Sequence, residues 1–154
     1  MRPFILLFLL LFGAIMLPVA NAGEGDDVDV RTYPSYAFGK TYTSIVKEDA
    51  LMKCPAWLET AENPPVSVRK AMRLADAKRQ QLVHDTKSCK WRRESVSLEF
   101  VDVEPSKRFY WHIHYQGHDS HALTGPGDEL DLFVLMDGKV VEPIVSLPGK
   151  EPGN

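Results

Sequence analysis

The sequence lacks the motifs that mark most enzyme active sites. It contains no Gly-x-Ser-x-Gly nucleophile turn, no His-Glu-x-x-His zinc motif and no glycine-rich phosphate loop. The carboxylate pair Asp26-Asp27 lies in a stretch whose composition predicts disorder. Ser120 lies between His118 and His121 in a glycine-rich loop, where a nucleophile has no rigid support. These absences favour a non-enzymatic protein.

Cysteine is also scarce, because the chain has only Cys54 and Cys89. There is no Cys-x-x-Cys pair and no cysteine next to a histidine, which argues against a redox motif or a cysteine-rich zinc site. In an oxidising compartment an isolated pair favours a disulfide. A Cys54–Cys89 bridge would close a loop of about 36 residues and stabilise the fold by about 4 kcal/mol on the chain-entropy model. Free or intermolecular thiols are the alternatives.

A strong charge of one sign is absent as well. The formal net charge is −3, and it becomes −4 if the first 22 residues are removed, because Arg2 is the only charged side chain among them. Such a balance argues against a nucleic-acid partner, which needs a basic face. Lysine and arginine are concentrated in Arg69–Arg93, where we interpret them as the solvated face of a helix.

Only one long apolar run exists, and it lies at the N-terminus. Phe4–Val19 carries no charge, follows a positive Arg2, and ends at Ala20-Asn21-Ala22, a small-x-small pattern. These features predict a signal peptide cleaved between Ala22 and Gly23, hence a protein exported to the periplasm or the medium. An uncleaved N-terminal anchor is the alternative. No later stretch suggests membrane contact.

The 132 residues after the predicted cleavage point have the size of one domain. Residues 23–63 predict an acidic flexible start and an irregular aromatic segment, because prolines and a glycine interrupt any long element. Within that segment a short strand near Tyr42–Val46 and a helical turn near Glu48–Lys53 are expected. Residues 64–146 predict a single α+β domain, and residues 147–154 a disordered tail.

Hydrophobic periodicity predicts the elements of that domain. Ser67 is a favourable N-cap for a helix over about Val68–His84, whose apolar residues fall on one face. Alternating patterns predict strands after it, and Asp137-Gly138 is a strong hairpin signal between the last two. The predicted fold is α+β, with one amphipathic helix packed on a four-stranded antiparallel meander and an irregular N-terminal segment. The predicted strands are Ser95–Val103, Arg108–Gln116, Leu130–Met136 and Lys139–Val145.

The strand Arg108–Gln116 has two distinct faces. Alternation places four apolar side chains on one face and four more polar ones on the other. Phe133 and Leu135 of the next strand are expected to share the second face. Either the aromatic residues of segment 31–57 cover this face, or it is a dimer or partner surface. The first face has Phe109, Trp111, Ile113 and Tyr115, and the second has Tyr110, His112, His114 and Gln116.

Four of the five histidines fall within ten residues, at His112, His114, His118 and His121. Two strand histidines on one face and one or two loop histidines have the donor type that zinc or copper prefers. The alternative is a row of solvated histidines. Imidazole also titrates near pH 6.5, so the same cluster has the chemistry of a pH switch. The loop Gly117–Glu129 contains His118 and His121. Its length is typical of a binding loop, and the alternative is a surface loop without a function.

Three motifs together resemble a known class of protein. They are Ser-x-Arg-Lys-Ala after a proline pair at residues 64–71, the aromatic strand Arg108–Gln116, and Val-Leu-Met-Asp-Gly-Lys-Val-Val-Glu-Pro at residues 134–143. This arrangement resembles small exported bacterial proteins of unknown function, and is similar to PepSY-type and cystatin-like modules, over about Pro64–Ser146. The Gln-x-Val-x-Gly inhibitory loop of cystatins is missing. The resemblance implies a small sheet wrapped around one helix and a binding role outside the membrane.

The sequence therefore predicts an exported, non-enzymatic binding module, either monomeric or homodimeric. Its expected partner is a protein or peptide, contacted through the sheet or the Gly117–Glu129 loop. The alternative is a zinc- or copper-binding protein that uses the four clustered histidines. No other cofactor is expected.

Overall fold

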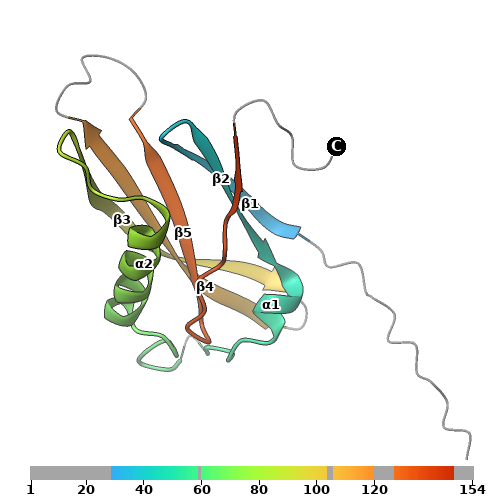
Figure 1. The fold of residues 1–154 in the computed structure, drawn as a ribbon. Helices are drawn as coiled ribbons and strands as arrows, with labels where there is room; N and C mark the ends of the chain where they lie inside the picture. The colour runs from blue at the N-terminus through green and yellow to red at the C-terminus, as the bar shows by residue number, and fades with distance from the viewer. Residues whose placement is uncertain (1–28, 59, 104–105, 120–126, 148–154) are drawn as a thin grey trace, which may run out of the picture.

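The computed structural model describes residues 29–58, 60–103, 106–119 and 127–147. Within these residues, six strands form two three-stranded antiparallel sheets, accompanied by two helices (Figure 1). The N-terminal sheet has the order β1-β2-β6, and the central sheet has the order β3-β4-β5. The elements are β1 Asp29–Ala37, β2 Lys40–Lys47, α1 Glu48–Met52, α2 Val68–Leu82, β3 Cys89–Val103, β4 Ser106–Asp119, β5 Glu129–Leu135 and β6 Ile144–Ser146.

This architecture is mostly β and corrects the predicted α+β fold with one helix on a four-stranded meander, of which only three strands are present in the central sheet. After the turn at Asp137-Gly138, the returning chain forms one isolated bridge between Val134 and Val140. It then leaves β5, and β6 pairs with β2 of the N-terminal sheet instead. Pro143 precedes β6 and has no amide hydrogen to donate to a ladder beside β5. The turn predicted at Asp137-Gly138 is therefore confirmed, and the strand predicted at Lys139–Val145 beside β5 is wrong.

The N-terminal segment predicted to be irregular is in fact the β1–β2 hairpin. The expected short strand and helical turn are confirmed as β2 and α1, whereas β1 was missed because Pro34 interrupts it. Pro34 pairs with Thr43 in register, and β1 is an edge strand of its sheet. A proline is tolerated at a sheet edge because its missing N–H faces away from the ladder.

The turn of this hairpin explains why its sequence carried no signal. Phe38 and Gly39 both have positive φ, of 49° and 68°. Two-residue hairpin turns of this kind usually carry Asn-Gly or Asp-Gly, because positive φ strains other side chains. Phe38 is held there by contacts: its amide donates to Asp128 Oδ1 at 3.0 Å, and its ring meets Trp91 edge-on at 5.9 Å.

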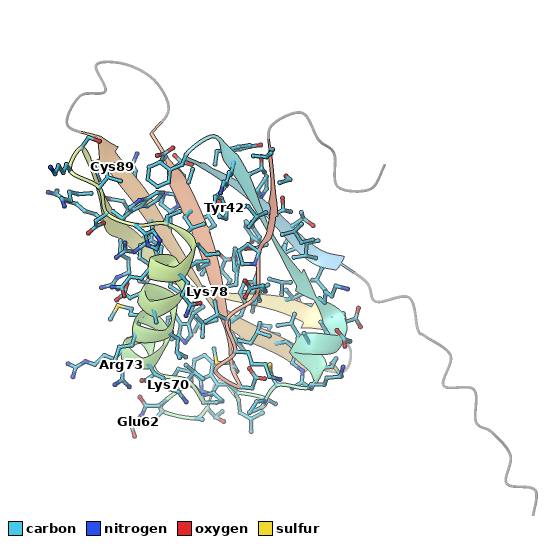
Figure 2. All side chains as sticks on the ribbon, in the orientation of Figure 1. Tyr42, Glu62, Lys70, Arg73, Lys78 and Cys89 are labelled. Carbon is cyan, nitrogen blue, oxygen red and sulfur yellow. The ribbon has the colours of Figure 1, made fainter. Side chains whose placement is uncertain are left out.

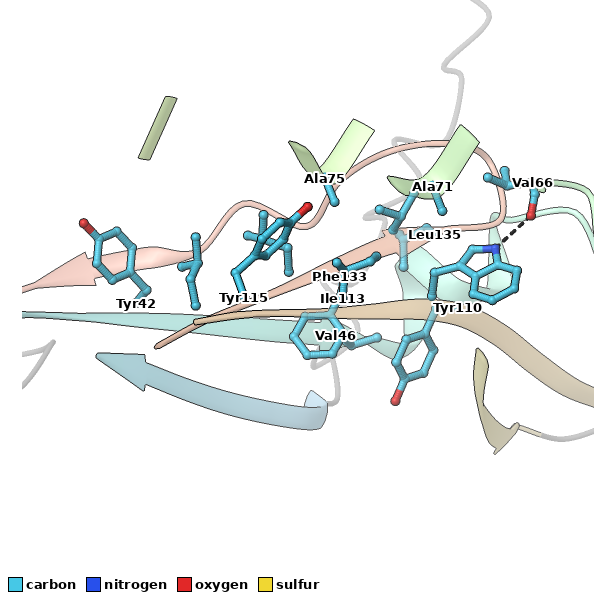
Figure 3. Close-up of a cluster of buried hydrophobic side chains, with 14 of the residues drawn as sticks. Tyr42, Val46, Val66, Ala71, Ala75, Tyr110, Ile113, Tyr115, Phe133 and Leu135 are labelled. Atoms are coloured by element: carbon cyan, nitrogen blue, oxygen red, sulfur yellow. Dashed lines mark hydrogen bonds between the residues drawn. The ribbon is translucent and has the colours of Figure 1, made fainter. Parts of the chain in front are cut away.

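The predicted helix is confirmed as α2 and ends two residues earlier than expected, at Leu82. Ser67 is its N-cap, and its hydroxyl accepts a hydrogen bond from the Lys70 amide. Ala71 and Ala75 are fully buried, so the helix backbone lies close to the central sheet (Figure 3). Arg73 projects from the opposite side of α2, as expected of a solvated face (Figure 2).

The alternation in β3 was recognised only from Ser95 onward because the strand contains a bulge. The register with β4 shifts between Arg93 and Ser95. An extra residue at that point moves every following side chain to the other face of the sheet. Trp91 therefore shares a face with Leu98, although the two do not fit one alternating pattern. The strand begins at Cys89, six residues before the predicted start.

Different elements pack on the two faces of the central sheet. The apolar face predicted for Arg108–Gln116 lies under α2, where the Trp111 indole donates to the Val66 carbonyl at 2.8 Å (Figure 3). The second face is covered by the β1–β2 hairpin, and the Tyr33 ring lies 4.5 Å from that of Phe133. The segment 31–57 thus covers this face, and residues on both sides of residue 63 share one hydrophobic core.

None of the helices in the described ranges is long and apolar enough to cross a bilayer. The predicted signal peptide, its cleavage point at Ala22 and Gly23, His121 and the tail from residue 148 all lie outside the described residues.

A cysteine cross-link tests the unexpected place of β6. Thr43 and Ile144 are register partners in β2 and β6, so cysteines at both positions should form a disulfide under mild oxidation. The background is Cys54→Ala with Cys89→Ala, and the product is measured by mass spectrometry. The meander would instead place Ile144 opposite Leu130. A Leu130→Cys/Ile144→Cys pair that cross-links more readily than Thr43→Cys/Ile144→Cys would contradict the structure.

Candidate functional site

A histidine held between two carboxylates lies at the centre of the face that the hairpin covers. His112 is on β4, and the neighbouring strands β3 and β5 supply Glu99 and Asp131. Glu99 Oε1 lies 2.7 Å from His112 Nδ1, and Asp131 Oδ1 lies 2.8 Å from His112 Nε2. A neutral imidazole has a single N–H and donates once, whereas an imidazolium donates from both nitrogens. The geometry therefore fits a protonated His112.

Both carboxylates have further partners. The hydroxyls of Tyr33 and Tyr110 donate to Glu99 Oε2 at 2.9 and 3.0 Å. Asp131 Oδ1 also lies 2.9 Å from His114 Nδ1. The hydrogen bonds join side chains from β1, β3, β4 and β5. We call this group the His112 cluster; its members are Tyr33, Glu99, Tyr110, His112, His114 and Asp131.

Aromatic rings close the cluster from the sides. The ring of Phe133 stacks on His112 at 4.6 Å with an interplanar angle of 23°, and the Tyr33 ring lies 5.3 Å away. The side chain of His112 is 18% exposed and that of Asp131 15%, so bulk water screens the pair only in part. A cation between aromatic rings gains a favourable electrostatic contribution, which is larger where water is excluded.

Burial and pairing act in opposite directions on these groups. Burial lowers the pKa of His112, but hydrogen bonds to Asp131 and Glu99 outweigh it, and the pKa rises above its ordinary value of 6.5. Burial raises the pKa of Glu99 and of Asp131, but hydrogen bonds from His112 and its neighbours lower both below their usual range. Burial raises the pKa of the Tyr110 hydroxyl, which stays protonated and donating.

An open pocket of about 520 Å³ lies beside the His112 cluster. Three of its lining residues, Tyr33, Glu99 and Tyr110, are members of the cluster. One wall is five consecutive residues of β3, Leu98–Asp102, and the other includes Arg31 and Tyr33 of β1. Both β1 and β3 are edge strands, so the pocket lies between the edges of the two sheets.

The histidines predicted to share a metal are placed far apart along β4. His112, His114 and His118 are on one face, but a strand rises by about 3.3 Å per residue, so His112 and His118 are separated by about 20 Å. His118 is exposed and bonds to Glu94 at 3.0 Å. Both nitrogens of His112 face carboxylates. Over the described ranges, no three His, Cys, Asp or Glu residues are arranged to hold a metal ion.

The structure does not contain the predicted Cys54–Cys89 disulfide. The Cys54 carbonyl accepts a hydrogen bond from Arg108 at 3.4 Å, and Cys89 pairs with Asp119. Arg108 and Asp119 are separated by about 36 Å along β4. A disulfide needs Cα atoms within about 7 Å, so the two buried cysteines are near opposite ends of the β3–β4 ribbon and are not bridged.

Sequence reasoning found the histidines of the cluster but not their partners. The carboxylates of Glu99 and Asp131 are separated from His112 by 13 and 19 positions in the chain. The available signal was cross-strand register, because Glu99 pairs with Tyr110 and Asp131 pairs with His114. A register read from the two strand pairs would have placed both carboxylates on the histidine face.

The cluster predicts a stability maximum in mildly acidic solution. Because the folded state binds the His112 proton more tightly than the unfolded state, stability falls as pH rises above about 6.5. Because folded Glu99 and Asp131 bind protons less tightly, stability also falls as pH drops below about 4.5. Urea unfolding should give a free energy about 1–2 kcal/mol lower at pH 8.5 than at pH 6.

His112→Gln should remove this alkaline loss, whereas His118→Gln, at an exposed position, should retain it. Equal loss in the wild type and in His112→Gln would show that other groups cause the pH dependence.

Comparison with known proteins finds no matching family model, no matching curated protein and no matching solved structure. The likeness to PepSY-type and cystatin-like modules stays a prediction, and the function has to be inferred from the geometry of the His112 cluster and its pocket.

Proposed function

We propose that this protein is an exported binding module that takes up an extended segment of a peptide or protein along the free edge of β3. The bound segment would lie in the pocket between β3 and β1. Addition of a strand to an open sheet edge is a common mode of peptide recognition, in which main-chain hydrogen bonds supply affinity and side-chain pockets supply specificity.

The observation that carries this proposal is the composition of the pocket wall. Successive side chains of a strand point to opposite faces of the sheet. In β3, Glu99 and Val101 are on the hairpin side, whereas Leu98 and Phe100 are on the α2 side. All four line the same pocket. The edge of the strand, rather than one of its faces, is therefore exposed to the pocket.

The register indicates which backbone groups are exposed at this edge. The Gly117 amide donates to the Asp128 carbonyl at 2.7 Å, so odd-numbered residues of β4 direct their backbone groups toward β5. Alternation directs even-numbered residues such as Tyr110 toward β3, and their β3 partners toward β4. Leu98 and Phe100 then direct their N–H and C=O groups toward the pocket. In the described part of the chain, no strand pairs with β3 on this side.

The size and the lining of the pocket suit a peptide. Its volume of about 520 Å³ lies within the range of about 300–1,000 Å³ that is typical of ligand sites. Tyr33 offers aromatic surface, and Phe100 is 48% exposed. Arg31 and Asp102, both exposed, place opposite charges on the two walls. Such a lining accommodates main chain and mixed side chains better than a small apolar molecule.

A binding role is favoured over acid–base catalysis by the His112 cluster because Glu99 and His112 are already engaged. Glu99 accepts hydrogen bonds on both oxygens, and His112 is bonded through both nitrogens. The usual requirement for a general acid or base is a free position that reaches the substrate.

A proline at the exposed edge provides the test. Phe100→Pro removes the central outward N–H while leaving the ladder to β4 intact, since a proline is tolerated at a strand edge. Phe100→Ala is the matched control, because it removes the ring and keeps the N–H. A phage library of random seven-residue peptides is selected on the wild-type protein. Selected peptides should bind Phe100→Pro about tenfold more weakly than Phe100→Ala, the upper range for one lost hydrogen bond.

Both variants are first compared by circular dichroism and thermal unfolding, so that a folding defect is not mistaken for a binding defect. If no peptide is enriched, or if the enriched peptides bind the two variants equally, strand addition at β3 is wrong.

A further inference from the structure

We propose that protonation of His112 fixes the two walls of this pocket in place, so that peptide binding weakens when His112 loses its proton. This inference rests on the proposed function for its binding part. Its structural part, the dependence of the walls on the proton, does not require a ligand.

Each wall of the pocket contributes a side chain to the His112 cluster. Tyr33 from β1 donates to Glu99 from β3 at 2.9 Å, which joins the two edge strands across the pocket. Glu99 is in turn bonded to His112 at 2.7 Å. The hydrogen bond between the two walls therefore depends on the orientation of one carboxylate, and that carboxylate is oriented by the imidazolium.

Loss of the proton changes this arrangement in a defined way. A neutral imidazole keeps one N–H, so a nitrogen lone pair then faces a carboxylate oxygen at 2.7 or 2.8 Å. That contact is repulsive, and the carboxylate has to move. If Nδ1 is the deprotonated nitrogen, Glu99 moves directly. If it is Nε2, Asp131 still has His114 as a partner.

The charge beneath the pocket changes at the same time. Two carboxylates and one imidazolium carry a net charge of about −1, which becomes about −2 when His112 is neutral. The repulsion between Glu99 and Asp131 is then no longer offset. The attraction between the cation and the rings of Tyr33 and Phe133 is lost too. Both changes loosen β1 from the central sheet.

Five other titratable groups face His112, and the tyrosines and carboxyls among them keep their charge while it titrates. They come from every strand packed against it: Tyr33 from β1, Glu99 from β3, Tyr110 and His114 from β4, and Asp131 from β5. Burial raises the pKa of both tyrosines, so they stay neutral. The pKa of each carboxyl is lowered, so both stay ionised. His114 is the remaining imidazole, and a variant separates its contribution.

The first experiment needs no ligand. Amide hydrogen exchange is followed for β1 residues 31–33 and 35 at pH values from about 5.5 to 8.5, corrected for intrinsic rates. Protection of these amides should fall by about tenfold across this range in the wild type, the effect of one pKa unit of linkage. The loss should be absent in His112→Gln and present in His114→Gln. Protection in β1 that does not change with pH, or that changes equally in His112→Gln, overturns the inference.

The second experiment uses the peptides selected from the seven-residue library. Their dissociation constants are measured for the three proteins at pH 6 and pH 8 by calorimetry. Wild type and His114→Gln should bind about tenfold more tightly at pH 6, and His112→Gln should bind equally at both values. By linkage, bound peptide should lower the acid dissociation constant of the His112 imidazolium by the same factor, which an NMR titration measures.

The outcomes separate the two proposals. Peptides that bind the wild type equally at both pH values overturn the regulation and retain the binding module. If the protein enriches no peptide but the amide hydrogen exchange of β1 still depends on His112, the binding module is wrong and the proton-dependent walls are retained.

Discussion

The pairing of one imidazolium with two carboxylates is the constraint on which the hairpin side of the central sheet depends. An unpaired buried charge costs several kcal/mol, and in practice such a group changes its protonation state instead. Here His112 donates to both Glu99 and Asp131 and offsets one of their two charges, and the two tyrosine hydroxyls donate to the second carboxylate oxygen of Glu99. Removal of the histidine would leave two carboxylates facing each other under an aromatic cover. The side-chain bonds that join β3, β4 and β5 on this face, and the docking of Tyr33, therefore depend on the same proton.

The hairpin is positioned on this face by polar contacts as well as by ring packing. Ser35 and Ser44 are buried, and both bond to the backbone of Asp131: its amide donates to the Ser35 hydroxyl at 3.2 Å, and its carbonyl accepts from Ser44 at 3.3 Å. Buried backbone groups need partners, so a shift of the hairpin by one residue would leave both groups of Asp131 unsatisfied. Apolar packing under α2 carries no such penalty. The polar face thus specifies register, while the apolar face contributes hydrophobic burial.

Elements set by local signals were predictable from the sequence, and those set by pairing were not. The helix from Val68 followed from the Ser67 cap and a 3.6-residue period, β4 followed from alternation, and β5 followed from the hairpin signal at Asp137-Gly138. The β1–β2 hairpin was hidden because Phe38 occupies a turn position that only its contacts with Trp91 and Asp128 make favourable. The place of β6 depends on a partner about 100 residues away in the chain, in β2. The same holds for the site: the histidine face was predicted, but its carboxylates come from two other strands.

The free edge of β3 carries different side chains in its two halves. This difference supports a binding role for the C-terminal half. An open strand edge invites unwanted pairing, and natural proteins usually protect it with charged side chains. The N-terminal half carries exposed charges at Lys90, Arg92 and Glu94. The C-terminal half exposes Leu98 and Phe100 to the pocket; the carboxylate of Glu99 between them is bonded to His112, and the next exposed charge is at Asp102. If the edge had only to be kept from pairing, the same protection would be expected along its whole length. An unprotected stretch confined to the pocket, with β1 as the opposite wall, is instead the arrangement that a transient strand partner requires.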